Sequence, residues 1–212
     1  MKISIIFLLY IIPLFIYSKS FSLLEIQRMA NDARESLDGA VIDVYREYTF
    51  VGNRDGSSEE THHIIMFINE QEGIHQSDFK IYYNSSYEKP ELISGRVIKP
   101  DGSITKMKKK SARSEGYLEA IDMELYSDIM VYILTLPGLE KGAIVEVVYE
   151  IARSHHPIKG EFWRELYIQK GNALWCWKYI IKMPRSKNIE FATFNFDGKC
   201  KKKIHNKMQE FI

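Results

Sequence analysis

The chain has 212 residues, enough for one large all-β domain or two small domains. Its composition, 45% hydrophobic and 13% aromatic, is sufficient for a packed core and excludes a wholly disordered chain. The formal net charge of +1 provides no overall field that would attract nucleic acid or an acidic substrate. The two cysteines, Cys176 and Cys200, are too few for a disulfide framework and leave either one bridge or two free thiols.

The first 20 residues have the features of a cleavable export signal. Lys2 gives a basic start, residues 3–17 are apolar, and Ser18 and Ser20 place small residues at the two positions that a signal peptidase requires. Because the apolar run is shorter than the ~20 residues that span a bilayer, an uncleaved anchor is the less favoured alternative. Residues 1–20 are therefore predicted to direct export to the periplasm or the cell surface, with no transmembrane segment left after cleavage.

An amphipathic helix is predicted next, over residues 21–38. Ser22 and Glu25 form an S-x-x-E capping box, in which each side chain bonds a backbone N–H at the helix start. Apolar residues then recur at helical spacing as far as Leu37, and Gly39 can end the helix. We expect this stripe to pack on a sheet, which is commoner for such helices than binding a separate partner.

From Val41 onward the period of the apolar residues changes to two, which is typical of β-strands. Turn residues such as those at 53–56 and 100–103 separate the runs. The expected strands are residues 41–50, 61–69, 79–83, 92–99, 104–107, 129–136, 143–151, 162–169, 175–183 and, less regular, 190–196. This spacing predicts an all-β fold, an antiparallel two-layer β-sandwich over residues 39–196 with one N-terminal amphipathic helix.

Residues 128–153 are predicted to form a central β-hairpin. Two runs rich in Val, Ile and Tyr flank a Pro- and Gly-containing turn at 137–142. In the second run the alternate residues from Ala143 to Ile151 share one face, so that face should be buried and the opposite face should be wet. The first run is apolar on both faces and should lie inside a sheet rather than at its edge.

Two segments break the pattern. Residues 106–126 begin with five basic residues and continue with an acidic stretch, which favours a solvated loop over a contact with an anionic surface or lipid headgroups; a helical turn at 117–125 is one option. The tail at 197–212 is basic and weakly patterned. It is interpreted either as a frayed end or as the start of a further, truncated unit.

The order of these turns and strands resembles an exported bacterial module, the domain-of-unknown-function family 3857. The resemblance lies in the strand and turn at 96–102, in Leu136-Pro137-Gly138 with Gly142, in the strand at 144–151 and in the closing segments between 162 and 184. It covers residues 38–194. The resemblance implies a module that commonly precedes a transglutaminase-like domain bearing a Cys, His and Asp set. Because that second domain is not recognised in this chain, the resemblance carries over no catalytic residue.

The cysteines are weak candidates for nucleophilic catalysis, which needs a thiolate, a nearby base and a group that orients the base. Cys200 lies among lysines, which favour a thiolate, and His205 follows it. The short tail offers too little scaffold for a dyad, so an exposed thiol is the preferred interpretation. Cys176 lies between two tryptophans and is expected to be a small packed side chain. We therefore predict no catalytic residue.

Two histidine pairs could suggest a metal site. His62 and His63 are neighbours in an expected strand and should point to opposite faces, so they cannot bind one ion together. His155 and His156 lie near a proline turn, where the rings could converge, but no carboxylate or cysteine accompanies them at the spacing of a zinc site. We expect no metal and no cofactor.

The aromatic residues are the remaining candidates for binding. Trp175, Trp177 and Tyr179 should share one strand face that continues into two aliphatic residues, which favours a core face over a platform for sugar rings. Trp163 and Tyr167 share a face of mixed polarity and are the better, though weak, candidates for an exposed contact.

Taken together, the sequence predicts an exported, non-catalytic module with a binding or scaffolding role at the cell envelope. Its expected partner is a protein or polysaccharide, with a transglutaminase-like or peptidase-like protein as the leading option. The alternatives are a free-standing carbohydrate- or peptide-binding module and, least favoured, a thiol hydrolase.

Overall fold

The computed structural model describes residues 20–117, 128–156, 158, 162, 168, 171–190, 192–195, 200–205 and 208–212. Within these residues the chain forms one α-helix, two short 3-10 helices and twelve strands in two sheets. The all-β class, the two layers and the N-terminal helix predicted from the sequence are thereby confirmed. No helix among the described residues has the length and apolar character that a membrane crossing requires.

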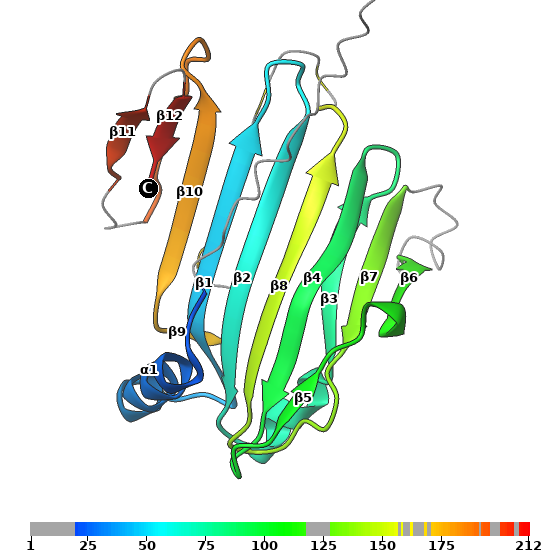
Figure 1. Ribbon diagram of the computed structural model, residues 1–212, viewed down its shortest axis with the longest axis vertical. Coiled ribbons are helices and arrows are strands. Elements are labelled where there is room, and N and C mark those ends of the chain that lie inside the picture. Colours follow the sequence, from blue (N-terminus) through cyan, green and yellow to red (C-terminus); the bar gives the residue numbers. More distant parts are fainter. Residues whose placement is uncertain are drawn as a thin grey trace, which may run out of the picture.

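The larger sheet contains nine strands in the order β11-β12-β10-β1-β2-β8-β4-β5, with β9 paired to β1, and the smaller sheet has the order β3-β7-β6 (Figure 1). The elements in chain order are α1 (Leu23–Ser36), β1 (Val41–Gly52), β2 (Ser58–Ile68), η1 (Gln71–Gln76), β3 (Asp78–Asn84), β4 (Glu88–Ile98), β5 (Ile104–Lys106), η2 (Lys109–Ser111), β6 (Ala112–Gly116), β7 (Ile129–Thr135), β8 (Ile144–Arg153), β9 (Ala173–Leu174), β10 (Trp177–Pro184), β11 (Lys202–His205) and β12 (Met208–Phe211).

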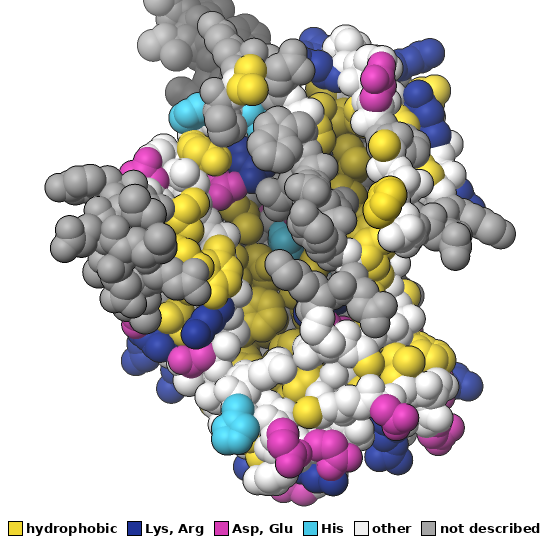
Figure 2. Space-filling model, turned by 180° about the vertical axis from the view of Figure 1, so that it is seen from behind, with side chains coloured by type: hydrophobic (Ala, Val, Ile, Leu, Met, Phe, Trp, Pro, Cys, Tyr) yellow, Lys and Arg dark blue, Asp and Glu magenta, His cyan; other side chains and the backbone are white. Residues whose placement is uncertain are grey.

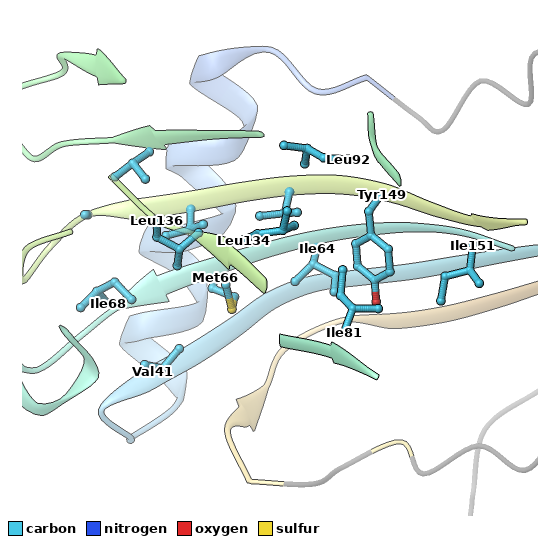
Figure 3. Packing of buried hydrophobic residues seen from close by; sticks show 14 residues of the cluster. Val41, Ile64, Met66, Ile68, Ile81, Leu92, Leu134, Leu136, Tyr149 and Ile151 are labelled. Carbon is cyan, nitrogen blue, oxygen red and sulfur yellow. The ribbon is translucent and has the colours of Figure 1, made fainter. Parts of the chain in front are cut away.

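The main core lies between the two sheets (Figure 3). Ile64 and Met66 of β2 and the inward residues of β8 face Ile81 and Leu134 of the smaller sheet, and all of them are buried. Burying an aliphatic side chain of this size contributes about 1.5–3 kcal/mol. We call the face of the larger sheet that carries the smaller sheet the inner face, and the opposite face the outer face.

Helix α1 packs on the outer face, as the sequence pattern predicts. The capping box is formed, because the Glu25 N–H donates to Ser22 Oγ over 3.3 Å and the Ser22 N–H donates to Glu25 Oε2 over 2.7 Å. The stripe of Ile26, Ala30 and Ala33 is buried against apolar residues of β1, β2, β4 and β8. The small alanines allow the helix backbone to approach the sheet closely.

The predicted central hairpin is wrong. β7 pairs with β3 and β6 in the smaller sheet, whereas β8 pairs with β2 and β4 in the larger sheet. The segment between them therefore crosses from one layer to the other. Alternation of apolar residues indicates which face of a strand is buried but not which strand lies beside it. The predicted middle position of β7 and the buried face from Ala143 to Ile151 are confirmed, but the opposite face of β8 is not wet, because Ile144 is buried beneath α1.

One part of the larger sheet is parallel rather than antiparallel. β1 runs parallel to β10, with Tyr48 opposite Tyr179, and also parallel to β9. The chain between Arg153 and Ala173 makes this geometry possible, because it exceeds the dozen or so residues that a parallel crossover needs.

Three local interpretations need correction. β6 lies in the segment that was predicted to be a loop, while the helical turn considered at 117–125 falls almost wholly outside the described residues. The tail is not frayed, because β11 and β12 form a hairpin that extends the larger sheet at β10. The described residues of the expected strand at 190–196 are not in a strand, and most of the expected strand at 162–169 is not described.

Candidate functional site

Strand β2 directs its two adjacent histidines to opposite faces of the larger sheet. His62 Nδ1 lies 2.9 Å from Tyr149 Oη on the inner face. His63 Nε2 lies 2.9 Å from Glu146 Oε1 on the outer face. The prediction that the two side chains point to opposite faces is confirmed by this geometry.

The second histidine pair does not converge either. His155 Nδ1 lies 3.0 Å from Ser154 Oγ and its ring packs near Tyr87, whereas the His156 ring packs edge-on to Phe162. Within the described part of the chain, no group of three or more His, Cys, Asp or Glu residues is placed to hold a metal ion.

The inner network, which we define as Glu60, His62, Tyr149 and Tyr48, joins β2 to its two neighbours. The His62 ring lies 4.4 Å from the ring of Tyr149 and 4.4 Å from the ring of Tyr48, measured between centroids. Its Nε2 lies 3.1 Å from Glu60 Oε1. A carboxylate, an imidazole and a phenol in this order could relay a proton, but Glu60 is only 2% exposed and Tyr149 only 6%. Such burial restricts the access of a substrate, whereas the contacts of the network join three neighbouring strands.

The aromatic face of β10 continues the inner face beyond this network. The rings of Trp177 and Tyr179 are stacked with 6.1 Å between centroids, and Tyr48 lies edge-on to both. Tyr179 and Met183 are 8% and 5% exposed. Hydrophobic side chains gather in the hollow of this face (Figure 2). Tyr179 and Met183 are buried in one cluster with Phe50, as expected for a core face, and Trp177 packs against them.

A charged side chain is held beside this aromatic block. Arg46 Nη2 lies 2.7 Å from Asp43 Oδ2, and Arg46 Nη1 donates to Tyr48 Oη over 3.1 Å. Burial alone would lower the pKa of Arg46, but Asp43 and Tyr48 together raise it by more. The guanidinium therefore stays charged and holds Tyr48 in place.

On the outer face, Glu146 links His63 and Arg96 across three strands. Its Oε1 contacts His63, and its Oε2 accepts a hydrogen bond from Arg96 Nε over 2.6 Å. Burial raises the pKa of Glu146, but the hydrogen bond from His63 and the charge of Arg96 lower it by more. Glu146 is therefore held as a carboxylate.

A second outer cluster lies beside it. Glu47 Oε2 accepts hydrogen bonds from Tyr45 Oη over 2.7 Å and from Lys178 Nζ over 2.9 Å. Burial, and then the Glu47 carboxylate, raise the pKa of Tyr45, so the phenol keeps its proton. Phe21 covers this region, with its ring 5.0 Å from that of Tyr45 and 5.5 Å from that of His63. Phe21 therefore shields the ring of His63 from solvent.

Among the described residues, a further concave feature is an open groove between α1 and the outer face, which we call the helix groove. It has a volume of about 750 Å³. Its floor is apolar and comes from three different strands, and its walls are helix α1 and the turns next to β4 and β8. The residues that line it are Leu24, Glu25, Gln27, Arg28, Ala30, Asn31, Asp32, Arg34, Phe67, Ile98, Lys99, Pro100, Gly142 and Ile144.

A family model described as "Domain of Unknown Function with solved-structure structure (DUF3857)" matches residues 54–211. The chain belongs to the DUF3857 family. The match spans most of both sheets and includes the β11–β12 hairpin, so the C-terminal strands are part of the family domain rather than an appendage. The family resemblance seen in the sequence is confirmed. A comparison with curated proteins gives no match.

Among the solved structures, one shares this fold over most of the chain. The crystal structure of a "putative protease" from Parabacteroides distasonis ATCC 8503 matches with a TM-score of 0.69 and 18% identity, over 81% of this chain and 34% of that one. The chain thus spans about a third of that protein, and the likeness shows the fold alone. Legionella pneumophila aminopeptidase A (TM-score 0.39, 8% identity, 84% of this chain, 20% of that one) and the CBM3a-L domain of Clostridium thermocellum scaffoldin CipA (0.34, 12%, 61% and 79%) are too distant to carry an argument.

The structure places the sequence candidates of this DUF3857 chain in different surroundings. Trp163 and Tyr167 lie outside the described residues, so their role as binding candidates stays a prediction. Trp175 precedes β10 and is 43% exposed, apart from the packed face of Trp177 and Tyr179. The expected face of three aromatic residues is therefore reduced to two.

Both cysteines are free and exposed. For Cys176 this corrects the expectation of a packed side chain, because Cys176 lies just before β10 begins rather than within the strand. Partial burial of its sulfur raises the pKa of the Cys176 thiol, and Lys178 offsets this only in part. Cys176 is thus disfavoured as a thiolate nucleophile.

The basic run at 106–113 is exposed, as predicted, but partly neutralised. Lys109 Nζ lies 2.6 Å from Glu91 Oε1, and Arg113 bonds Asp78 and Glu115. These partners reduce the field that an anionic surface would meet.

The sequence did not reveal the helix groove or the inner network. A signal for the network was present, since Glu60 and His62 occupy inward positions of a strand whose next inward residues are Ile64 and Met66. A polar group at such a position needs a buried partner.

Proposed function

We propose that this DUF3857 chain is an exported, non-catalytic module that binds a polypeptide partner at the cell envelope, as the front piece of a transglutaminase-like or peptidase-like system. The observation that carries the proposal is the unequal coverage of the Parabacteroides protein: 81% of this chain corresponds to 34% of that one. In such an arrangement this module contributes a binding surface, and the remainder of the system contributes the chemistry.

The engagement of the reactive side chains supports binding rather than catalysis. His62 is enclosed by two tyrosine rings, and His63 is bonded to Glu146 and covered by Phe21. Burial raises the pKa of the Cys176 thiol. The two histidines of β2 therefore join neighbouring strands, and the Cys176 thiol is disfavoured as a nucleophile.

A polypeptide partner is favoured over a polysaccharide by the packing of the aromatic residues. A sugar platform needs exposed, contiguous rings, but Tyr179 is buried with Phe50 and Met183 in one cluster and Trp177 packs against it. The helix groove on the outer face, beside α1, is lined by polar and charged side chains as well as apolar ones, which suits a polypeptide.

The test is an activity assay on the chain purified from cells that express all 212 residues. We expect neither hydrolysis of labelled casein nor incorporation of a labelled primary amine into casein above a heat-denatured sample. Activity that persists in the Lys110→Glu control but disappears in Cys200→Ala would replace the proposal with the thiol-hydrolase alternative. Activity that survives Cys200→Ala would equally contradict a non-catalytic module.

A further inference from the structure

The helix groove combines an apolar floor with a wall that offers hydrogen bonds. Phe67, Ile98 and Ile144 form the floor. Each is at most 6% exposed, whereas Leu24 at the rim is 76% exposed. The exposed Leu24 side chain costs free energy in water, and an occupant that covered it would recover that cost. The volume of about 750 Å³ is within the range of sites that enclose a ligand.

The helical wall presents a polar stripe. Gln27, Arg28, Asn31 and Arg34 recur at helical spacing and all line the groove. Among the described residues, neither Arg28 nor Arg34 forms an ion pair or a side-chain hydrogen bond. The side-chain amides of Gln27 and Asn31 can each donate and accept hydrogen bonds, which suits the N–H and C=O groups of a peptide backbone. The two guanidinium groups remain available to carboxylates.

The charges around the groove favour an acidic occupant. Lys99 on the opposite wall adds a third cation and lies 3.6 Å from Glu140, a loose and exposed pair. The lining also holds two carboxylates, Asp32 and Glu25, the latter bonded to the Ser22 backbone in the capping box, so three cations stand against two anions. The lining therefore has an excess of positive charge.

We propose that the helix groove binds an extended, acidic polypeptide segment of the partner protein. A large apolar side chain of the segment rests on Phe67, Ile98 and Ile144, and flanking carboxylates bond Arg28 and Arg34. A single-chain amphiphile such as a fatty acid has one carboxylate and, along its chain, no N–H or C=O groups that could bond the amides of Gln27 and Asn31. The inference deepens the proposed function, on which it rests, by naming the surface and the chemistry of the partner.

The test uses three synthetic peptides and the chain purified from cells that express all 212 residues. One peptide alternates leucine and glutamate, the second replaces glutamate by lysine, and the third replaces leucine by serine. Fluorescence anisotropy should show binding of the leucine–glutamate peptide, weakened by salt as expected for exposed charges. The other two peptides should bind at least roughly tenfold more weakly.

Variants localise the binding. Arg28→Glu/Arg34→Glu changes two exposed side chains and should weaken the leucine–glutamate peptide roughly tenfold or more. Lys110→Glu/Lys201→Glu, with the same change of charge at exposed sites outside the groove, should leave affinity unchanged. Asn31→Trp fills the groove without altering charge and should also weaken binding. In NMR spectra the methyl signals of Ile98 and Ile144 should shift on binding, while that of Ile204, exposed on β11, should not.

Several results would overturn the inference. One is that the leucine–glutamate peptide does not bind at concentrations up to about 1 mM. Another is that the two charge-reversed variants lose the same amount of affinity for the peptide. The others are that a fatty acid displaces the peptide, or that self-association of the protein shifts the Ile98 and Ile144 signals. If the peptide does not bind to the helix groove and no enzymatic activity is found, the groove is excluded as the binding site but the proposed function still stands. If enzymatic activity is found and the peptide still binds to the groove, only the proposed non-catalytic function is contradicted.

Discussion

The hydrogen bond between Tyr149 and His62 offers a sharp test of the inner network. Tyr149→Phe deletes the hydroxyl but keeps the ring, which should remain stacked 4.4 Å from the imidazole of His62. The variant thus leaves Nδ1 of His62, a residue only 7% exposed, without its 2.9 Å partner. Leaving one buried polar group unsatisfied costs about 1–3 kcal/mol, so we expect a loss of unfolding free energy in that range.

The chain provides a matched control for this substitution. Tyr82→Phe removes the same hydroxyl from a side chain that is 57% exposed on β3, and it should change stability by less than about 0.5 kcal/mol. Both variants can be compared with the wild type by urea unfolding followed by tryptophan fluorescence, with the slopes checked for equality. If Tyr149→Phe is no more destabilising than Tyr82→Phe, the bond does not stabilise the sheet and the structural role of the network is refuted.

The remaining predictions concern the core, the outer face and export. Leu134→Ala, at a site 1% exposed between the sheets, should lower the free energy of unfolding by about 3 kcal/mol. The control Leu24→Ala should lower it by less than about 0.5 kcal/mol. Equal losses of unfolding free energy in urea would contradict the two-sheet core. The lowered pKa of Glu146 means that its stabilisation is present above the ordinary carboxyl pKa and is lost as pH falls through the lowered value. The stability gap between wild type and Glu146→Gln, measured in urea at several pH values, should therefore be widest near neutral pH and close in acid; a constant gap would refute this. Fusing residues 1–20 to alkaline phosphatase without its own leader should give active, periplasmic enzyme, and inactive enzyme retained in the cytoplasm would contradict export.

The elements of the fold were largely predictable because their signals are local. The capping box of Ser22 and Glu25 marks the start of α1, and the change of period at Val41 marks the start of β1. Partners of strands were not predictable in the same way. The runs at 129–136 and 143–151 look like a hairpin because a turn separates them, yet each finds its neighbours in a different sheet.

The C-terminal strands show how a local signal can mislead. Lys201, Lys202 and Lys203 suggest a solvated tail, but β11 is the outermost strand of the larger sheet. Lysines on an exposed edge discourage further strand pairing, so the composition that suggested a tail is equally typical of an edge strand.

The candidate site was harder to predict than the fold because it is assembled from distant parts of the chain. The polar stripe of Arg28, Asn31 and Arg34 is visible in the sequence as the wet side of a helix. Only the packing of α1 on the sheet places it opposite Ile98 and Ile144, which lie on different strands. Helix periodicity shows which residues face away from the core but not what lies across from them.

The central claim is that this chain holds a polypeptide without altering it. The most direct test is to incubate the leucine–glutamate peptide with a saturating amount of the protein and follow the peptide by mass spectrometry. We expect the peptide to bind and to be recovered intact, with the bound fraction falling as the salt concentration rises. A cleaved peptide, a peptide covalently joined to the protein or a peptide that never binds would contradict it.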